Sequence, residues 1–392
     1  MMSRKAMYAA LAISVLGAVN AKTSQSMKNE VDSRRAEGPA GLEKFIRAHQ
    51  KELARGDFHS REALDRICAQ YDCNSSKLYW HTDIEAAKAT ARAEHKPILS
   101  LRLLGRLDEE LSCANSRFFR KLLYPDPRVS AFLREHYVLH WESVRPVPKV
   151  TIDFGDGRVL KQTITGNSIH YVLDSDGRPI DAIPGMVAPE AFLASLSQAE
   201  TLARTLAPLA PGEREVALEQ WHRERLEQTL AAWEGDLRRL DPQTAIPKTM
   251  PLLQGSVLEK ASEGRWSSIA ALHRLEAALD PTVEMQTELA VTGALEARRS
   301  VFPTAWEAAP IAYGKLLTES PLLRQLKQAV AEDTVRNRYQ LHRQIHEWLT
   351  VTQYNQVESL NARVYSELFL SPLNDPWYGL KPASVFSGLD DA

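Results

Sequence analysis

Cysteine is the residue type whose chemistry is easiest to interpret here, because the chain has only three cysteines. Cys113 lies at the start of a predicted helix over 112–124, in the sequence Cys-Ala-Asn-Ser that ends at Ser116. Unpaired backbone N–H groups at a helix start favour a thiolate, and the nearby Arg117 adds positive charge. A single thiol of this kind could form mixed disulfides, rearrange other disulfides or be oxidised by peroxide. The opposing interpretation is a small buried side chain without chemistry.

The other two cysteines, Cys68 and Cys73, enclose four residues. Outside the cytoplasm, cysteines this close in sequence can close a small loop by a disulfide bond. The sequence therefore predicts a Cys68–Cys73 disulfide and leaves Cys113 as the unpaired thiol.

Two further pairs of polar residues could react or bind a ligand, but both have simpler explanations. His342 and His346 are four residues apart on a predicted helix, a spacing that can present two imidazoles to one metal ion. Their order is not the H-E-x-x-H of zinc peptidases and no third ligand is evident in the sequence, so we predict neither a metal site nor a cofactor. Asp153 and Asp156 flank a glycine-rich turn, whose shape they are expected to set.

Strands and helices alternate in the region that must position Cys113. Thr82 and Glu85 have the spacing of a capping box at the start of a helix, which Lys96-Pro97 ends. An apolar run over 98–104 is typical of a central strand covered on both faces. Further strands and helices are expected at 112–124, 137–144, 149–165 (a hairpin), 169–174, 179–183 and 188–206. This order predicts an α/β fold.

With these elements placed, residues 80–206 resemble thioredoxin-like domains. In that family a tryptophan, a helix and a Lys-Pro pair precede the strand that leads to a C-x-x-C motif, and one subgroup has Gly-x-Pro before a later strand and an Asp-Gly-x-Pro turn after it. The residues that match are Trp80, Lys96-Pro97, Gly166 and Asp176-Gly177-Arg178-Pro179. The resemblance implies a central mixed sheet flanked by helices, with a site around Cys113.

Two departures from the family pattern concern that site directly. Ser116 stands where the second, resolving cysteine would be, and Ser168 stands where the family has a cis-proline that packs against the motif. Because a dithiol oxidoreductase needs both sulfurs, ordinary thioredoxin turnover is not expected. Arg145, at the end of the neighbouring strand, could assist thiolate formation or form a surface salt bridge. The candidate site residues are therefore Cys113, Ser116, Ser168 and Arg145.

The N-terminus has the features of an export signal. Arg4 and Lys5 precede an apolar run over 6–19, and Val19-Asn20-Ala21 offers small residues for cleavage after Ala21. The apolar run is shorter than the about 20 residues that span a bilayer. We therefore predict a signal peptide over 1–21, a mature chain without a transmembrane span, and an extracytoplasmic location, either periplasmic or secreted.

Composition divides the rest of the chain. A flexible lead-in is expected over 22–40 and a helical segment over 41–79. The residues 208–212 (Pro-Leu-Ala-Pro-Gly) are a predicted linker, after which helical periodicity dominates and six of the eight tryptophans occur. The sequence thus predicts a mostly α-helical C-terminal domain over 213–392 after the α/β thioredoxin-like domain.

Two functions fit these observations. In the first, an exported thioredoxin-like protein uses Cys113 as a single thiol in thiol–disulfide exchange or redox protection, with a protein thiol as substrate. In the second, the thioredoxin-like domain is a redox-dead platform, and the chain is a non-catalytic scaffold whose helical half binds a protein partner. A net charge of −2 without a basic block argues against nucleic acid. Whether the chain is an enzyme, then a monothiol oxidoreductase or isomerase, depends on the reactivity of Cys113.

Overall fold

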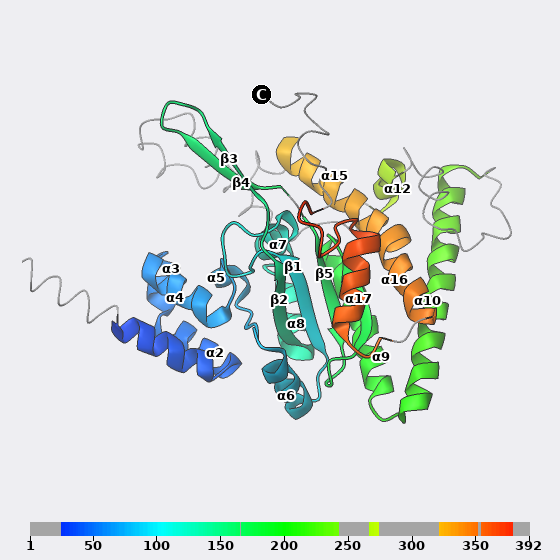
Figure 1. Cartoon of the computed structure of the whole chain (residues 1–392), viewed down its shortest axis with the longest axis horizontal. Helices are drawn as coiled ribbons and strands as arrows, with labels where there is room; N and C mark the ends of the chain where they lie inside the picture. Colours follow the sequence, from blue (N-terminus) through cyan, green and yellow to red (C-terminus); the bar gives the residue numbers. More distant parts are fainter. Residues whose placement is uncertain (1–24, 165, 243–265, 274–320, 352–353, 379–392) are drawn as a thin grey trace, which may run out of the picture.

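A mixed sheet of four strands forms the centre of the computed structural model, which describes residues 25–164, 166–242, 266–273, 321–351 and 354–378. The strands have the order β2-β1-β5-β6 (Figure 1), with bounds β1 Ile98–Leu104, β2 Val138–Arg145, β5 Ser168–Leu173 and β6 Pro179–Pro184. β1 pairs parallel with β2 and antiparallel with β5, which pairs antiparallel with β6. The predicted central mixed sheet is therefore confirmed.

Helices flank this sheet and continue after it. Within the α/β region they are α6 (Ile84–Glu94), α7 (Ala114–Phe118), the π-helical turn η1 (Phe119–Leu123), α8 (Pro127–His136) and α9 (Pro189–Leu206). After residue 206 they are α10 (Pro211–Leu240), α12 (Trp266–Leu272), α15 (Pro321–Arg336), the π-helical turn η2 (Asn337–Leu341), α16 (His342–Val351), α17 (Val357–Arg363) and the π-helical turn η3 (Val364–Leu368). The predicted helical C-terminal region is confirmed for the described residues.

Helices cover both faces of the sheet. On one face, the Phe192 ring of α9 packs on His170 of β5, and the Tyr124 hydroxyl after η1 lies 2.7 Å from His170 Nε2. On the other face, the Tyr171 hydroxyl donates to Asn361 Oδ1 of α17 at 3.1 Å. Figure 1 shows α17 crossing in front of the sheet. All seven residues of β1 are buried, which is the burial predicted for a central strand.

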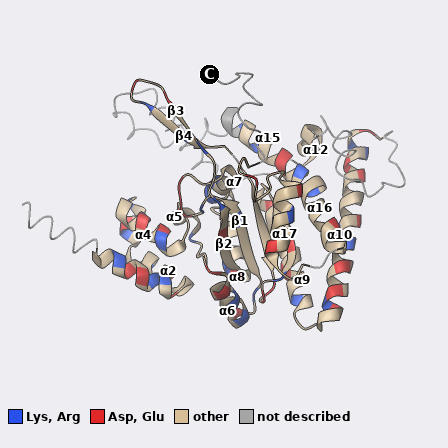
Figure 2. Cartoon of the chain, viewed as in Figure 1, with Lys and Arg blue, Asp and Glu red and all other residues tan. Residues whose placement is uncertain are grey.

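The C-terminal helices do not form a separate core. Buried side chains of the sheet and of α10, α15, α16 and α17 belong to one hydrophobic cluster. Figure 2 shows that residues of both signs alternate along α10, whereas few charged residues occur on β1, β5 and β6. The predicted linker at 208–212 separates two helices but not two hydrophobic cores.

The N-terminal helices form a smaller cluster of their own. They are α2 (Pro39–Ala48), α3 (Gln50–Ala54), α4 (Phe58–Cys68) and α5 (Cys73–Ser76). The prediction of a flexible lead-in over 22–40 is wrong for residues 25–36, which are helical. Val31 explains the difference, because it is buried in the same cluster as Leu42 and Phe45 of α2. The surrounding sequence is polar and has no periodicity, so one buried apolar side chain was not enough to predict the helix.

Two other predictions concern the ends of elements. Asp83, rather than Thr82, caps α6, because its carboxylate accepts hydrogen bonds from the N–H groups of Glu85 and Ala86. Cys68 and Cys73 form the predicted disulfide, which links the end of α4 to the start of α5.

A two-stranded hairpin projects from the body of the molecule (Figure 1). Its strands β3 (Lys149–Asp153) and β4 (Val159–Thr163) pair only with each other among the described strands. This is the hairpin predicted over 149–165.

The predictions of no transmembrane span and of a signal peptide concern different parts of the chain. Among the described helices, none is both long and apolar enough to cross a bilayer. The predicted signal peptide over 1–21 lies outside the described residues.

Candidate functional site

Cys113 lies immediately before α7, where the chain turns from the end of β1 into the helix. Its backbone N–H donates to the Leu104 carbonyl at 3.3 Å, which ties the cysteine to the central strand. The Ser116 hydroxyl lies 2.9 Å from the Cys113 carbonyl oxygen and 2.6 Å from Ser112 Oγ. Ser116 therefore closes the first turn of α7, a structural role that a resolving cysteine would not have.

The segment before β5 returns beside this turn. A Cβ atom on Gly166 would lie 2.7 Å from Asn115 Oδ1, so the missing side chain allows the close approach. Ser168 then begins β5 opposite Leu103, and its buried hydroxyl has no hydrogen-bond partner among the described residues. The structure thus brings Cys113, Ser116 and Ser168 together near the end of β1.

The thiol of Cys113 is enclosed. Cys113 is completely buried. This burial raises the pKa of the thiol, although hydrogen bonds with Ser116 lower it in part. Burial, and then the charge that Cys113 would carry as a thiolate, raises the pKa of the Tyr124 and Tyr365 hydroxyls. Tyr365 of η3 donates to the Asn167 carbonyl oxygen at 3.2 Å, which joins the C-terminal region to the segment that precedes Ser168. Desolvation therefore opposes the thiolate that the helix start and Arg117 would favour.

Arg145 binds the C-terminal tail rather than a thiolate. Its guanidinium donates to the carbonyl oxygens of Leu373 at 3.1 Å and Asp375 at 2.7 Å, and it stacks 3.6 Å from the centre of the Tyr378 ring. A second nitrogen lies 3.2 Å from Ser371 Oγ. Neither predicted role, thiolate activation or a surface salt bridge, matches these contacts, so Arg145 anchors the tail to the end of β2.

The arrangement around Cys113 does not fit nucleophilic chemistry. Thiol–disulfide exchange needs an accessible sulfur with thiolate character. This sulfur is inaccessible, its pKa is raised, and its neighbours Tyr124 and Tyr365 are neutral phenols.

A second cluster of functional side chains lies between the sheet and the C-terminal helices. His342 and His346 of α16 meet Asp181 of β6 and His222 of α10. Asp181, His222 and His346 are buried, and they form the one group of three potential metal ligands found within the described residues. Asp181 and His222 were not predicted as ligands, because they are far from the His342–His346 pair along the chain.

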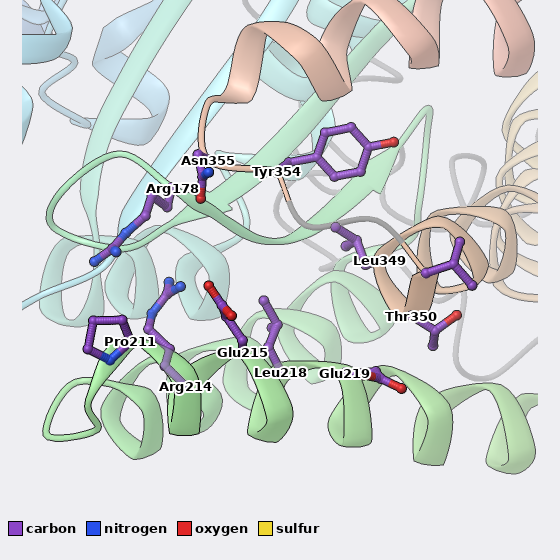
Figure 3. Close-up of a pocket in the computed structure, with 11 residues that line it drawn as sticks. Arg178, Pro211, Arg214, Glu215, Leu218, Glu219, Leu349, Thr350, Tyr354 and Asn355 are labelled. Atoms are coloured by element: carbon purple, nitrogen blue, oxygen red, sulfur yellow. The ribbon is translucent and has the colours of Figure 1, made fainter.

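Two cavities complete the candidate sites. A small pocket of about 100 Å³ is lined by Arg214 and Leu218 of α10 and by Leu349 of α16 (Figure 3). This volume is well below the roughly 300–1,000 Å³ of typical small-molecule sites. A larger cavity of about 420 Å³ lies between α2, α6 and β2, but its Lys96 and Arg134 are engaged, with Glu94 and with the Ser76 carbonyl respectively.

Comparisons of the chain with protein-family models, curated proteins and solved structures found no match.

Proposed function

We propose that the chain is an exported protein with a thioredoxin-like domain that binds another protein without using thiol chemistry. The observation that carries the proposal is the complete burial of Cys113. A buried thiol of raised pKa is a packing residue, which favours the scaffold hypothesis over single-thiol exchange.

The sheet supports the thioredoxin-like part of the proposal. It is mixed and carries helices on both faces, as the resemblance implies, and the cysteine turn follows its central strand β1. The approach of Gly166 to Asn115 adds a contact between the two halves of the resembling region.

The disulfide supports export. Cys68 and Cys73 are both completely buried and bonded to each other. Structural disulfides of this kind persist in oxidising compartments and are rare in the cytosol. Export is tested by sequencing the N-terminus of the mature protein from its native host, which we expect to begin at Lys22.

The projecting hairpin is the surface that we propose for the partner. Val150 and Ile152 alternate along β3 and so share one face, and Leu160 of β4 stands opposite Ile152 on that face. Phe154 follows β3 and donates its backbone N–H to the Arg158 carbonyl oxygen at 3.1 Å. Phe154 is 54% exposed and Ile152 46%. Exposed apolar side chains gathered on one element typically mark an interaction site.

The charge of the hairpin indicates the chemistry of its partner. Lys149, Arg158 and Lys161 are nearly balanced by Asp153 and Asp156, so the hairpin lacks the strong positive charge of a nucleic-acid or anionic-membrane site. The occupant that fits is a protein with an apolar surface of its own.

Thiol accessibility tests the first half of the proposal. We expect Cys113 in the folded, oxidised protein to resist alkylation until denaturant is added. Rapid modification of the native protein would instead support single-thiol chemistry and end the scaffold hypothesis.

Cross-linking tests the second half. Wild type and the Ile152→Ser/Phe154→Ser double variant are compared by chemical cross-linking in extracts of the native host. Val216→Ser, on α10, is the matched control because Val216 is an apolar side chain that is 65% exposed. We expect one cross-linked protein with wild type and Val216→Ser that is lost with the hairpin variant. An unchanged pattern with the hairpin variant, or no cross-linked protein with wild type, would contradict the proposal.

A further inference from the structure

Asp181, His222 and His346 bring three potential ligand atoms to one buried point. Each comes from a different element, namely β6, α10 and α16, and the three atoms lie within 4.8 Å of one another. The ion pairs of Asp181 within the described residues are with His342 and His346. A buried carboxylate surrounded by imidazoles is unusual, since buried charges are normally paired with a cation or bound to a metal.

The distances suit a small tetrahedral ion. Ligands about 2.0–2.2 Å from a zinc ion stand about 3.3 Å apart. The Nδ1 atoms of His222 and His346 are 2.9 Å apart, and His346 Nδ1 is 3.9 Å from Asp181 Oδ1. The observed separations lie on either side of the ideal value, so small side-chain rotations would admit the ion.

A hydrogen bond fixes which nitrogen of His222 faces the cluster as a ligand. His222 Nε2 lies 3.1 Å from the Ile180 carbonyl oxygen, which can only accept, so Nε2 carries the proton. The lone pair of His222 is therefore on Nδ1, directed at His346. Metal-binding histidines usually donate their second nitrogen to a carbonyl in this way. Without metal, His346 Nδ1 donates to His222 Nδ1; when both bind metal, the His346 proton resides on its Nε2.

His342 positions the carboxylate. Its Nε2 lies 3.0 Å from Asp181 Oδ1, and its ring stacks on His346 with 4.3 Å between ring centres. The Ala182 backbone N–H donates to the same oxygen at 2.8 Å. These contacts hold Asp181 toward the two histidine ligands.

The protonation states agree with metal binding. Burial lowers the pKa of His222 to about 4 and lowers that of His346, so both imidazoles are neutral at pH 7. Burial alone would raise the pKa of Asp181, but its carboxylate accepts hydrogen bonds from the Ala182 N–H and from His342 Nε2, and these favour the ionised form. Neutral imidazole and ionised carboxylate are the forms that bind metals.

We propose that Asp181, His222 and His346 bind one Zn²⁺ ion, with His342 as a positioning residue. Two nitrogen ligands and one oxygen favour zinc over calcium and magnesium, which prefer oxygen ligands alone. Three protein ligands leave one position of a tetrahedral ion open.

Metal retention tests the proposal. The full mature chain is stripped with a chelator, incubated with Zn²⁺ or Co²⁺, gel-filtered, and assayed for metal by mass spectrometry and for the visible absorption of tetrahedral Co²⁺. We expect one ion per chain and a higher melting temperature with Zn²⁺ than with chelator. Asp181→Asn and His346→Gln should abolish retention, and His342→Gln should weaken affinity by about 10–100-fold.

His273→Gln is the matched control. His273 Nε2 lies 2.5 Å from Asp236 Oδ2, so this is another buried imidazole–carboxylate pair of the helical region, outside the cluster. The His273→Gln variant should bind zinc as wild type does. If the ligand variants do not fold, the Co²⁺ spectrum and the chelator-dependent melting temperature of wild type still decide. No retained metal in wild type, or equal retention in all variants, would mean a hydrogen-bonded network only.

Discussion

The surroundings of Cys113 and of His222 differ in a way that the sequence does not reveal. Cys113 lies just before a helix, yet the fold buries it completely. His222 has no motif around it, yet the fold brings it to Asp181 and His346. Both places are buried, so burial alone does not separate them. The two places differ in how many functional atoms meet there. Cys113 contributes a single sulfur atom, whereas His222 lies with Asp181 and His346, so that three ligand atoms are directed at one point.

Acidification should produce the largest effect, through His170 beside Tyr124. Burial lowers its pKa from 6.5 to about 3. Between pH 6.5 and about 3 the unfolded chain binds this proton and the folded chain does not. The free energy of unfolding therefore decreases as the pH is lowered through this range, by up to about 5 kcal/mol in total. Urea unfolding across this range measures the loss. His170→Gln should make this loss smaller without removing it, because burial also lowers the pKa of His140 to about 3 and that of His222 to about 4. His59→Gln, at an exposed position of α4, should leave the loss unchanged. If the pH profile of stability were unchanged in His170→Gln, His170 would not be desolvated in the folded protein.

Opening the enclosure should have the next largest effect. Tyr365→Ala removes a buried aromatic ring, and we expect a loss of about 3–5 kcal/mol in unfolding free energy. The same variant should make Cys113 accessible to alkylation in the native state. Tyr365→Phe keeps the ring but loses the hydrogen bond to the Asn167 carbonyl, 3.2 Å long, at a cost of about 1 kcal/mol, and should keep Cys113 protected. Continued protection in Tyr365→Ala would assign the enclosure to other residues.

The disulfide should contribute less, because the loop that it closes is short. Cys68 and Cys73 are separated by 5 positions, for which loop-closure entropy gives about 2 kcal/mol. Cys68→Ser/Cys73→Ser should lower the unfolding free energy by this amount in denaturant titrations. Cys113→Ser serves as the comparison, since it removes a sulfur without removing a cross-link. A double variant as stable as wild type would contradict the estimate.

Completing a C-x-x-C motif should have the smallest effect. Ser116→Cys places a second sulfur three positions after Cys113, but positions 113 and 116 are both completely buried. We expect no reductase activity in an insulin-reduction assay, with thioredoxin as the positive control. Activity in this variant would show that enclosure does not prevent exchange and that only the second sulfur is missing.

The sequence predicts most of the sheet and little of the candidate sites. An apolar run of strand length located β1, because a strand that is buried on both faces is apolar at consecutive positions. Alternation of apolar residues before a glycine-rich turn located the hairpin. The capping residue of α6 was misplaced by one position, since Thr82 and Asp83 are both good caps and the backbone selects between them. The helix around Val31 was missed because one buried apolar side chain gives no periodicity.

The sites depended on contacts between distant segments. The sequence showed His342 and His346 as a pair without a third ligand, because Asp181 and His222 are supplied by other elements. It placed Arg145 at the end of its strand, but the partners that occupy it come from the C-terminal tail.

The sequence by itself determined the alternation of strands and helices, the Cys68–Cys73 pairing and the serine three positions after Cys113, because periodicity, short loops and residue identity are local properties. Only the tertiary structure decided that Cys113 is enclosed and that His222 joins Asp181 and His346. The physical reason is that desolvation and ligand convergence depend on which side chains are neighbours in space. Those neighbours come from segments that the chain order keeps apart.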